Sequence, residues 1–356
     1  MSKIHNFSAG PSILPKQVIE QASQAILDFD NMGLSLIEIS HRSKNFEAVM
    51  DEARNLVKEL LHLPERYEVL FLQGGATLGF YTVAMNLLKE GGKAAYVNTG
   101  VWATGAIKEA KLVGNIEVIG DSSDKNHSYI PSFHVPNDAD YLHITSNNTI
   151  FGTQYQQFPE SNVPLVCDMS SDIFSKKFDA SKFSLIYAGA QKNMGPAGTV
   201  LYIVDKEILG KSGRKLPVYL DLAAHIEKDS MYNTPPVFAV YASMLTLRWI
   251  KENGGLDGME KRNDAKQKLF YGELDRNSLF KGHSVPESRS WMNATFTLVN
   301  DALSVEFDKM WKAAGISGLA GHRSVGGYRA SMYNALPIES VQVLVDVMKE
   351  FETKFG

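Results

Sequence analysis

Cysteine is almost absent from this chain of 356 residues, since Cys167 is the only one. A single cysteine excludes an intrachain disulfide and a cluster of thiolate ligands, and we expect no metal site. Long apolar runs are missing too, because runs such as residues 69–72 are far too short to cross a bilayer. The first residues lack the basic start and apolar core of a signal peptide, so we expect a cytoplasmic protein.

Neither acidic nor basic residues are in large excess. The chain has 40 acidic and 36 basic residues, and its formal net charge is −4. Nothing in this balance favours nucleic acid or an anionic membrane as a partner. Any binding of anions must therefore depend on a local group of cations.

Short apolar segments alternate with amphipathic ones through most of the chain. The expected strands are residues 68–72, 94–98, 116–119, 141–145, 163–168, 185–188 and 199–204. The expected helices among them are residues 15–29, 46–61, 78–89 and 102–112. This alternation predicts an α/β fold with a mostly parallel central sheet that helices cover on both faces.

The pattern changes after Met231. Helices are expected at residues 237–251 and 256–276 with a break at Gly254-Gly255, and then a strand, a helix, a strand and a helix at residues 294–299, 303–314, 328–332 and 337–355. We therefore expect a large domain over residues 16–262 and a smaller C-terminal α+β domain over residues 263–356. Residues 1–15 are expected to pack against the small domain and the active site.

Lys192 lies in a loop between two strands that we expect to be buried, residues 185–188 and 199–204. Desolvation lowers the pKa of a lysine, and an unprotonated amine attacks carbonyls and aldehydes. Lys192 is therefore a candidate for forming a Schiff base. A surface lysine is the plain alternative, and only the rest of the chain decides between the two.

Ligands of an open parallel sheet collect beyond the carboxyl ends of its strands. The turn Gln73-Gly74-Gly75-Ala76-Thr77 offers backbone N–H groups to a phosphate, or is only a tight turn. Asp168 ends a buried strand and needs a cationic partner, unless it caps a helix. Trp102 is placed to cover a flat ligand, or is a core residue, and Thr149 offers a hydroxyl, or forms a turn.

Together these groups match the requirements of pyridoxal 5′-phosphate (PLP). A helix N-terminus would hold the phosphate, a ring would stack on the pyridine, a carboxylate would keep the ring nitrogen protonated, and a lysine would take the aldehyde. Lys192, once displaced by an amino substrate, would then carry the proton of transamination.

The chain resembles the phosphoserine aminotransferases, which are class V aminotransferases of fold type I. The resemblance extends over the whole chain and is carried by Asn6-Phe7-Ser8-Ala9-Gly10-Pro11, Glu38-Ile39-Ser40-His41-Arg42, residues 187–198, Met231-Tyr232-Asn233-Thr234-Pro235-Pro236 and residues 321–331. It implies that Lys192 is the Schiff-base lysine, Asp168 the pyridine partner, Trp102 the stacking ring and Thr149 the neighbour of the phenolic oxygen.

The resemblance also implies a homodimer with shared sites. The cofactor phosphate would be held by Ala76, Thr77 and Gln191, together with Asn233 and Thr234 of a second subunit. Relatives often carry an arginine where this chain has Thr77, so its phosphate pocket is less basic unless another cation compensates. The implied reaction converts O-phospho-L-serine and 2-oxoglutarate to 3-phosphohydroxypyruvate and L-glutamate, in serine biosynthesis. Use of 4-phosphohydroxy-L-threonine in pyridoxine biosynthesis, as in some relatives, stays open.

A His-Arg pair followed by serine occurs twice in the sequence, which suits a small substrate with several negative charges. Arginine binds carboxylate and phosphate through paired hydrogen bonds. We expect Arg329 to bind the α-carboxylate, and we expect a group of four to bind the distal phosphate, or the side chain of glutamate: His41, Arg42, His322 and Arg323.

Three other functions remain open. A cysteine desulfurase of the same fold needs a reactive loop cysteine, whereas Cys167 lies in an expected strand. A serine–glyoxylate aminotransferase shares the fold, and fold alone does not fix the chemistry. A PLP-binding protein without catalysis has no use for Lys192, Asp168 and Arg329 together.

Overall fold

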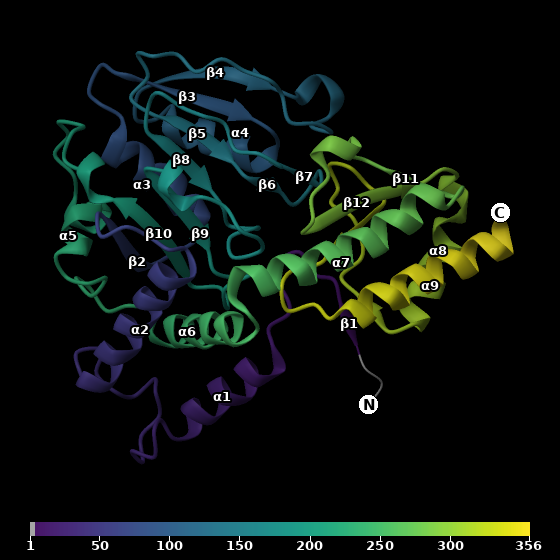
Figure 1. Ribbon diagram of the computed structural model, residues 1–356, viewed down its shortest axis with the longest axis horizontal. Coiled ribbons are helices and arrows are strands. Elements are labelled where there is room, and N and C mark those ends of the chain that lie inside the picture. The colour runs from purple at the N-terminus through teal and green to yellow at the C-terminus, as the bar shows by residue number, and fades with distance from the viewer. Residues whose placement is uncertain (1–3) are drawn as a thin grey trace.

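A seven-stranded sheet forms the centre of the larger part of the computed structural model, which describes residues 4–356 (Figure 1). Its strands are β2 (Tyr67–Gln73), β3 (Lys93–Asn98), β4 (Asn115–Asp121), β5 (Leu142–Thr145), β8 (Leu165–Asp168), β9 (Leu185–Gly189) and β10 (Thr199–Asp205). They lie in the order β2-β10-β9-β8-β5-β3-β4. Only β10 is antiparallel to its neighbours β2 and β9. The expected mostly parallel sheet is confirmed.

Helices cover both faces of this sheet. One layer consists of α1 (Lys16–Leu27), α2 (Lys44–Leu60) and α6 (Val237–Glu252), and the other of α3 (Ala76–Leu87), α4 (Val101–Ala110) and α5 (Leu222–Ile226). Side chains alternate along each strand, so in β10 Leu201 and Ile203 pack into the first layer, and Val200 and Tyr202 into the second. Burial on both faces explains why inner strands such as β9 and β10 are continuous apolar runs, whereas the edge strand β4 is partly exposed and carries charged residues.

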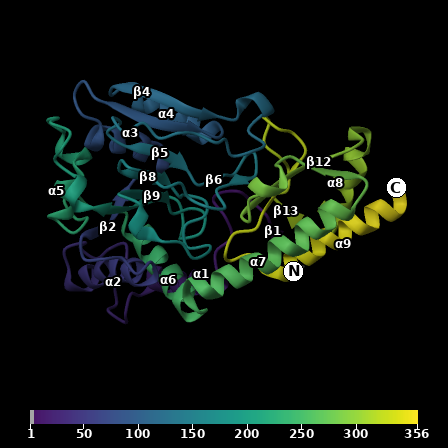
Figure 2. The same ribbon diagram turned by 45° about the horizontal axis from the view of Figure 1, so that its top comes forward.

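The C-terminal part has its own core. It contains the long helix α7 (Gly255–Arg276), the strands β11 (Phe280–Gly282), β12 (Asn293–Leu298) and β14 (Tyr328–Ser331), and the helices α8 (Ser304–Ala313) and α9 (Ile338–Phe355). The strands form an antiparallel sheet in the order β11-β12-β14, and α9 lies beside α7 (Figure 2). Phe280, Phe296, Phe307 and Phe351 meet in this core at edge and tilted angles.

The N-terminal segment lies against both parts. Strand β1 (His5–Asn6) pairs in parallel with β13 (Ile316–Ser317), and Phe7 is buried in the C-terminal core. Further on, the hydroxyl of Ser12 donates to the carbonyl of Lys192 at 2.5 Å. These contacts agree with the expected packing of residues 4–15, whereas residues 1–3 of that segment lie outside the described residues. Residue 262 falls inside α7, so the proposed division of the domains passes through a helix and not through a linker.

The elements that sequence patterns did not predict are short. They include β1, β11, β13, β6 (Asn147–Asn148), β7 (Thr153–Gln154) and α5. Strands of two or three residues show no period, so they form only where tertiary contacts place a partner beside them. None of the helices within residues 4–356 is long and apolar enough to span a membrane.

Candidate active site

A cavity of about 370 Å³ opens beyond the carboxyl ends of β2, β3, β5, β8 and β9, where the N-terminal segment and the small domain also reach the sheet. Many residues singled out from the sequence line it: Ala76, Thr77, Trp102, Thr149, Asp168, Gln191, Lys192, His322 and Arg329. They come from five loops of the large domain and two segments of the small one. The fold therefore brings together groups that lie up to 253 positions apart, from Ala76 to Arg329.

Lys192 follows β9 and points its ammonium toward the cavity. The Nζ atom lies 5.7 Å from the centroid of the Trp102 ring. Burial lowers the pKa of Lys192, while the carboxylates of Asp168 and Asp172 oppose this shift and Arg329 adds to it. An amine with a lowered pKa is unprotonated more often at neutral pH, which is the form that attacks an aldehyde.

Asp168 ends β8 and is only 5% exposed. Its Oδ1 atom accepts hydrogen bonds from the backbone N–H of Ser170 at 2.9 Å and from its hydroxyl at 2.6 Å. Burial raises the pKa of this carboxyl, and Lys192 and Ser170 oppose the rise. Among the described residues Oδ2 has no hydrogen-bond partner, so this oxygen is free to accept a donor in the cavity.

Ser170 was missed in the sequence, although a signal existed. An aspartate followed two positions later by serine, directly after a strand, forms an Asx-type turn in which the serine orients the carboxylate. The Ser170 hydroxyl in turn accepts from the N–H of Gly189 at 3.0 Å, which ties the ends of β8 and β9 together. Ala9 and Gly10, which also line the cavity, were quoted in a motif but given no role.

Trp102, Thr149 and Arg329 form a connected row along one wall. The indole N–H of Trp102 donates to the hydroxyl of Thr149 at 3.0 Å, and Nη1 of Arg329 donates to the Thr149 carbonyl at 3.1 Å. The Nε atom of Arg329 is buried and has no hydrogen-bond partner among residues 4–356. Burial lowers the pKa of Arg329 below its ordinary value. An unpaired donor of this kind points to an anionic ligand.

The N-terminus of α3 faces the same cavity through Gly75, Ala76 and Thr77. No side chain of the described part of the chain caps this end of the helix, and its first turn carries no acidic residue. Its free N–H groups and the positive end of the helix dipole therefore remain available to an anion. This arrangement agrees with the expected phosphate site.

Five expected site residues lie outside this cavity. Asn233 and Thr234 contact Gln73, where the Asn233 amide donates to the Gln73 side chain at 2.9 Å and the Gln73 amide donates to the Thr234 carbonyl at 2.8 Å. His41 and Arg42 precede α2 and contact each other at 3.4 Å, and Arg323 is exposed. Their roles remain proposals.

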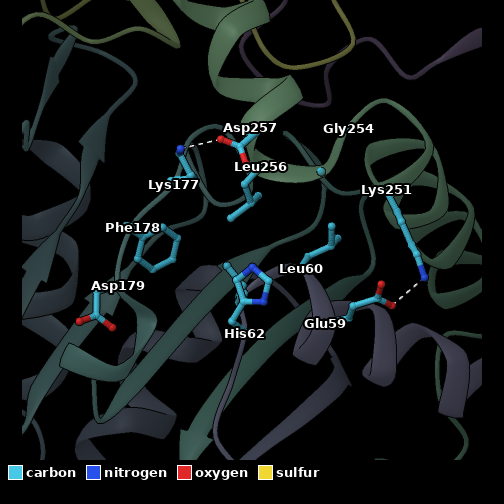
Figure 3. A pocket seen from close by; sticks show the side chains of 12 residues that line it. Glu59, Leu60, His62, Lys177, Phe178, Asp179, Lys251, Gly254, Leu256 and Asp257 are labelled. Carbon is cyan, nitrogen blue, oxygen red and sulfur yellow. Dashed lines mark hydrogen bonds and ion pairs between the residues drawn. The ribbon is translucent and has the colours of Figure 1, made fainter.

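A second hollow lies at the junction of α2, α6 and α7 (Figure 3). Its floor is apolar, with Leu60, Phe178 and Leu256, and its cations are already paired, since Lys177 contacts Asp257 at 2.5 Å and Lys251 contacts Glu59 at 2.7 Å. It therefore offers no unpaired charge to an anionic substrate. Within residues 4–356, no three His, Cys, Asp or Glu side chains gather as a metal site.

Comparison with known proteins agrees with this geometry. The family model described as aminotransferase class-V matches residues 4–344. The phosphoserine aminotransferase of Flavobacterium johnsoniae is 64% identical over 354 residues, which are 99% of each chain. The crystal structure of phosphoserine aminotransferase from Bacillus circulans subsp. alkalophilus has a TM-score of 0.96 at 44% identity and covers 99% of both chains. A PLP-bound phosphoserine aminotransferase from Trichomonas vaginalis has a TM-score of 0.92 at 35% identity, over 98% of this chain and 100% of that one. The chain therefore belongs to the class-V aminotransferase family, with the α/β architecture of fold type I, and within that family to the phosphoserine aminotransferases.

Proposed function

We propose that this protein transfers the amino group of O-phospho-L-serine to 2-oxoglutarate, giving 3-phosphohydroxypyruvate and L-glutamate in serine biosynthesis. The name of its relatives supports this reaction. The observation that carries the proposal is the amine of Lys192 above the Trp102 ring, in one cavity with Asp168 and Arg329.

The cavity fits PLP in three respects. The uncapped N-terminus of α3 suits the phosphate, the free Oδ2 of buried Asp168 suits a protonated ring nitrogen, and the Trp102 ring gives a flat surface beside Lys192. When bound, PLP supplies an aldehyde for the lysine and a ring that draws electrons from the substrate α-carbon.

The residues of this chain then have separate tasks. Lys192 carries a proton between the substrate and the cofactor. Asp168 would accept a hydrogen bond from the ring nitrogen and keep it charged, while Ser170 fixes the orientation of the carboxylate. Thr149 holds the Trp102 ring in place and would be the neighbour of the phenolic oxygen. Ala76, Thr77 and Gln191 would hold the phosphate.

The substrate is bound by cations of two kinds. Arg329 takes the α-carboxylate through the edge of its guanidinium that includes the unpartnered Nε. His322 lies at the same cavity and takes the distal phosphate together with Arg323. Glutamate places its side-chain carboxylate in the same subsite, so one set of cations serves both substrates.

Two copies of the chain complete each site in this proposal. Asn233, Thr234, His41 and Arg42 would reach the cavity of the partner copy, since they do not line the cavity of their own. Exposed apolar side chains support this arrangement, because Val101 and Trp102 at the start of α4 and Phe238 at the start of α6 are each 37–40% exposed. Comparing the oligomeric state and activity at falling protein concentration tests it.

The rival functions make different demands. The lone thiol of Cys167 is fully buried in β8, and burial raises its pKa well above the ordinary value, which disagrees with a desulfurase nucleophile. Adding glutamate to the PLP-loaded protein tests the transaminase: the visible band of the lysine-linked cofactor should give way to that of the amine form. A spectrum that does not change with glutamate or phosphoserine would refute the proposal. Competition among phosphoserine, 4-phosphohydroxythreonine and serine then defines the substrate.

A further inference from the structure

Lys266 is a fully buried lysine that the proposed reaction does not use. It lies in α7, has 0% exposure, and donates from Nζ to two successive backbone carbonyls, Met332 at 2.9 Å and Tyr333 at 2.6 Å. Within residues 4–356 no carboxylate pairs with it. Burial and the nearby Arg262 both lower its pKa. An amine buried without a countercharge costs free energy, so packing alone gives no reason for a lysine here.

The two carbonyls belong to the segment that follows β14. Arg329 lies in β14, three positions before Met332. One residue beyond Tyr333, the backbone N–H of Asn334 donates to Oδ1 of Asn193 at 3.0 Å, and Asn193 is the direct neighbour of Lys192. A short stretch of backbone and one hydrogen bond therefore link the strand that carries Arg329 to the neighbour of Lys192.

A second contact from α7 holds the same segment. The amide of Asn263 donates to Oδ1 of Asn334 at 2.8 Å and to the carbonyl of Ser175 at 2.7 Å, and the amide of Asn334 donates to the carbonyl of Phe174 at 2.9 Å. Ser175 and Phe174 lie in the loop that begins at Asp168. We call Asn193, Asn263, Lys266 and Asn334 the interdomain clasp. Each of them is at most 4% exposed.

The clasp joins three segments whose functional groups must keep fixed distances in a transaminase. They are the strand of Arg329, the loop of Lys192 and the loop that begins at Asp168. Among residues 4–356, only the Thr149 carbonyl accepts a hydrogen bond from the guanidinium of Arg329, so the position of this group depends on the strand that carries it. A misplacement of about 1 Å can reduce a rate about hundredfold. Two donors of one lysine on successive carbonyls restrain the backbone more tightly than apolar packing does, because hydrogen bonds are directional.

We propose that Lys266 is a positioning residue that, through the clasp, sets the distance between the carboxylate-binding Arg329 and the amine of Lys192. This inference rests on the proposed transaminase function. It assigns to Lys266 a role in the binding of substrates that carry an α-carboxylate, and none in the reactivity of the lysine-linked cofactor itself.

The test compares Lys266→Met with Lys268→Met. Both changes remove an ammonium from α7, but Lys268 is at the surface and pairs with Asp264 at 2.6 Å. Each PLP-loaded variant is mixed with glutamate, which needs Arg329, and with hydroxylamine, a small amine without a carboxylate. Lys266→Met should slow the reaction with glutamate at least about tenfold. This is the effect of losing one charged hydrogen bond between Arg329 and the substrate α-carboxylate. Its reaction with hydroxylamine and both reactions of Lys268→Met should be unchanged.

Equal slowing of both reactions, or no slowing of either, would overturn the inference. If Lys266→Met fails to fold, Asn263→Ala removes the other contact of α7 with the segment and leaves Lys266 in place, and it should give the same separation of the two reactions. Wild-type protein that reacts with hydroxylamine but not with glutamate would contradict the proposed function instead, so the two failures are distinguishable.

Discussion

Replacing Arg329 with alanine tests the substrate site most directly. In the structure Nη1 is occupied by the Thr149 carbonyl at 3.1 Å, whereas the buried Nε has no partner. The edge that includes Nε and Nη2 is therefore the one that can bind a carboxylate with two parallel hydrogen bonds. Burial lowers the pKa of this side chain, but an arginine guanidinium remains charged at neutral pH.

The size of the effect follows from these two bonds. A hydrogen bond to a charged group contributes about 1.5–3 kcal/mol, so two contribute about 3–6 kcal/mol. Arg329 is only partly buried, and water screens it, so we expect the lower end. A loss of about 3 kcal/mol corresponds to a decrease of roughly hundredfold in kcat/KM. Arg329→Lys keeps the charge but not the paired donors, and it should recover part of this loss.

The assay is a single-turnover reaction of the PLP-loaded variants with glutamate and with phosphoserine. Both substrates carry the α-carboxylate, so Arg329→Ala should affect them alike. His322→Asn should lower kcat/KM for phosphoserine more strongly than kcat/KM for L-alanine, an amino-acid substrate without a distal anion. The Arg329→Ala variant also loses the bond to Thr149, so thermal unfolding and the spectrum of the bound cofactor serve as controls. Unchanged kcat/KM for both substrates, or an effect confined to phosphoserine, would refute the assignment.

Four further outcomes are expected. Lys192→Ala should abolish both the visible band of the bound cofactor and turnover, and persistence of both would contradict its role. In cofactor-free protein, formaldehyde with cyanoborohydride as the hydride donor should methylate the Lys192 amine with a pH midpoint below 10.5. Because the Asp168 carboxylate opposes this lowering of the pKa, Asp168→Asn should move the midpoint further down. Thr77→Arg should slow release of the cofactor by up to about tenfold, through one added charged hydrogen bond to its phosphate, and equal release rates would count against that site. Mixing inactive Lys192→Ala with inactive Thr234→Arg should restore part of the activity if sites are shared in a dimer, and no recovery in mixed dimers would oppose sharing.

Periodicity and chemistry in the sequence determined most of the fold. The strands that became β2, β3, β9 and β10 are apolar runs of strand length, and such short runs between turn residues are typical of strands buried on both faces of a sheet. The long helices were predicted for a similar reason, and their ends differ by one or two residues because terminal turns depend on local hydrogen bonds. Lys192, Asp168 and Trp102 were recognisable because each lies at the end of an expected strand or within four residues beyond it, where a parallel sheet collects its ligands.

Tertiary structure alone decided which of these groups meet. Arg329 reaches Thr149, and Asn334 reaches Asn193, across more than one hundred positions, and no local pattern encodes such a contact. The burial of Lys266 was equally invisible, because a lysine in a charged helix normally faces water. The physical reason is that hydrophobic periodicity specifies which face of a helix or strand is buried. The polar contacts between distant elements depend instead on how the large and the small domain pack against each other.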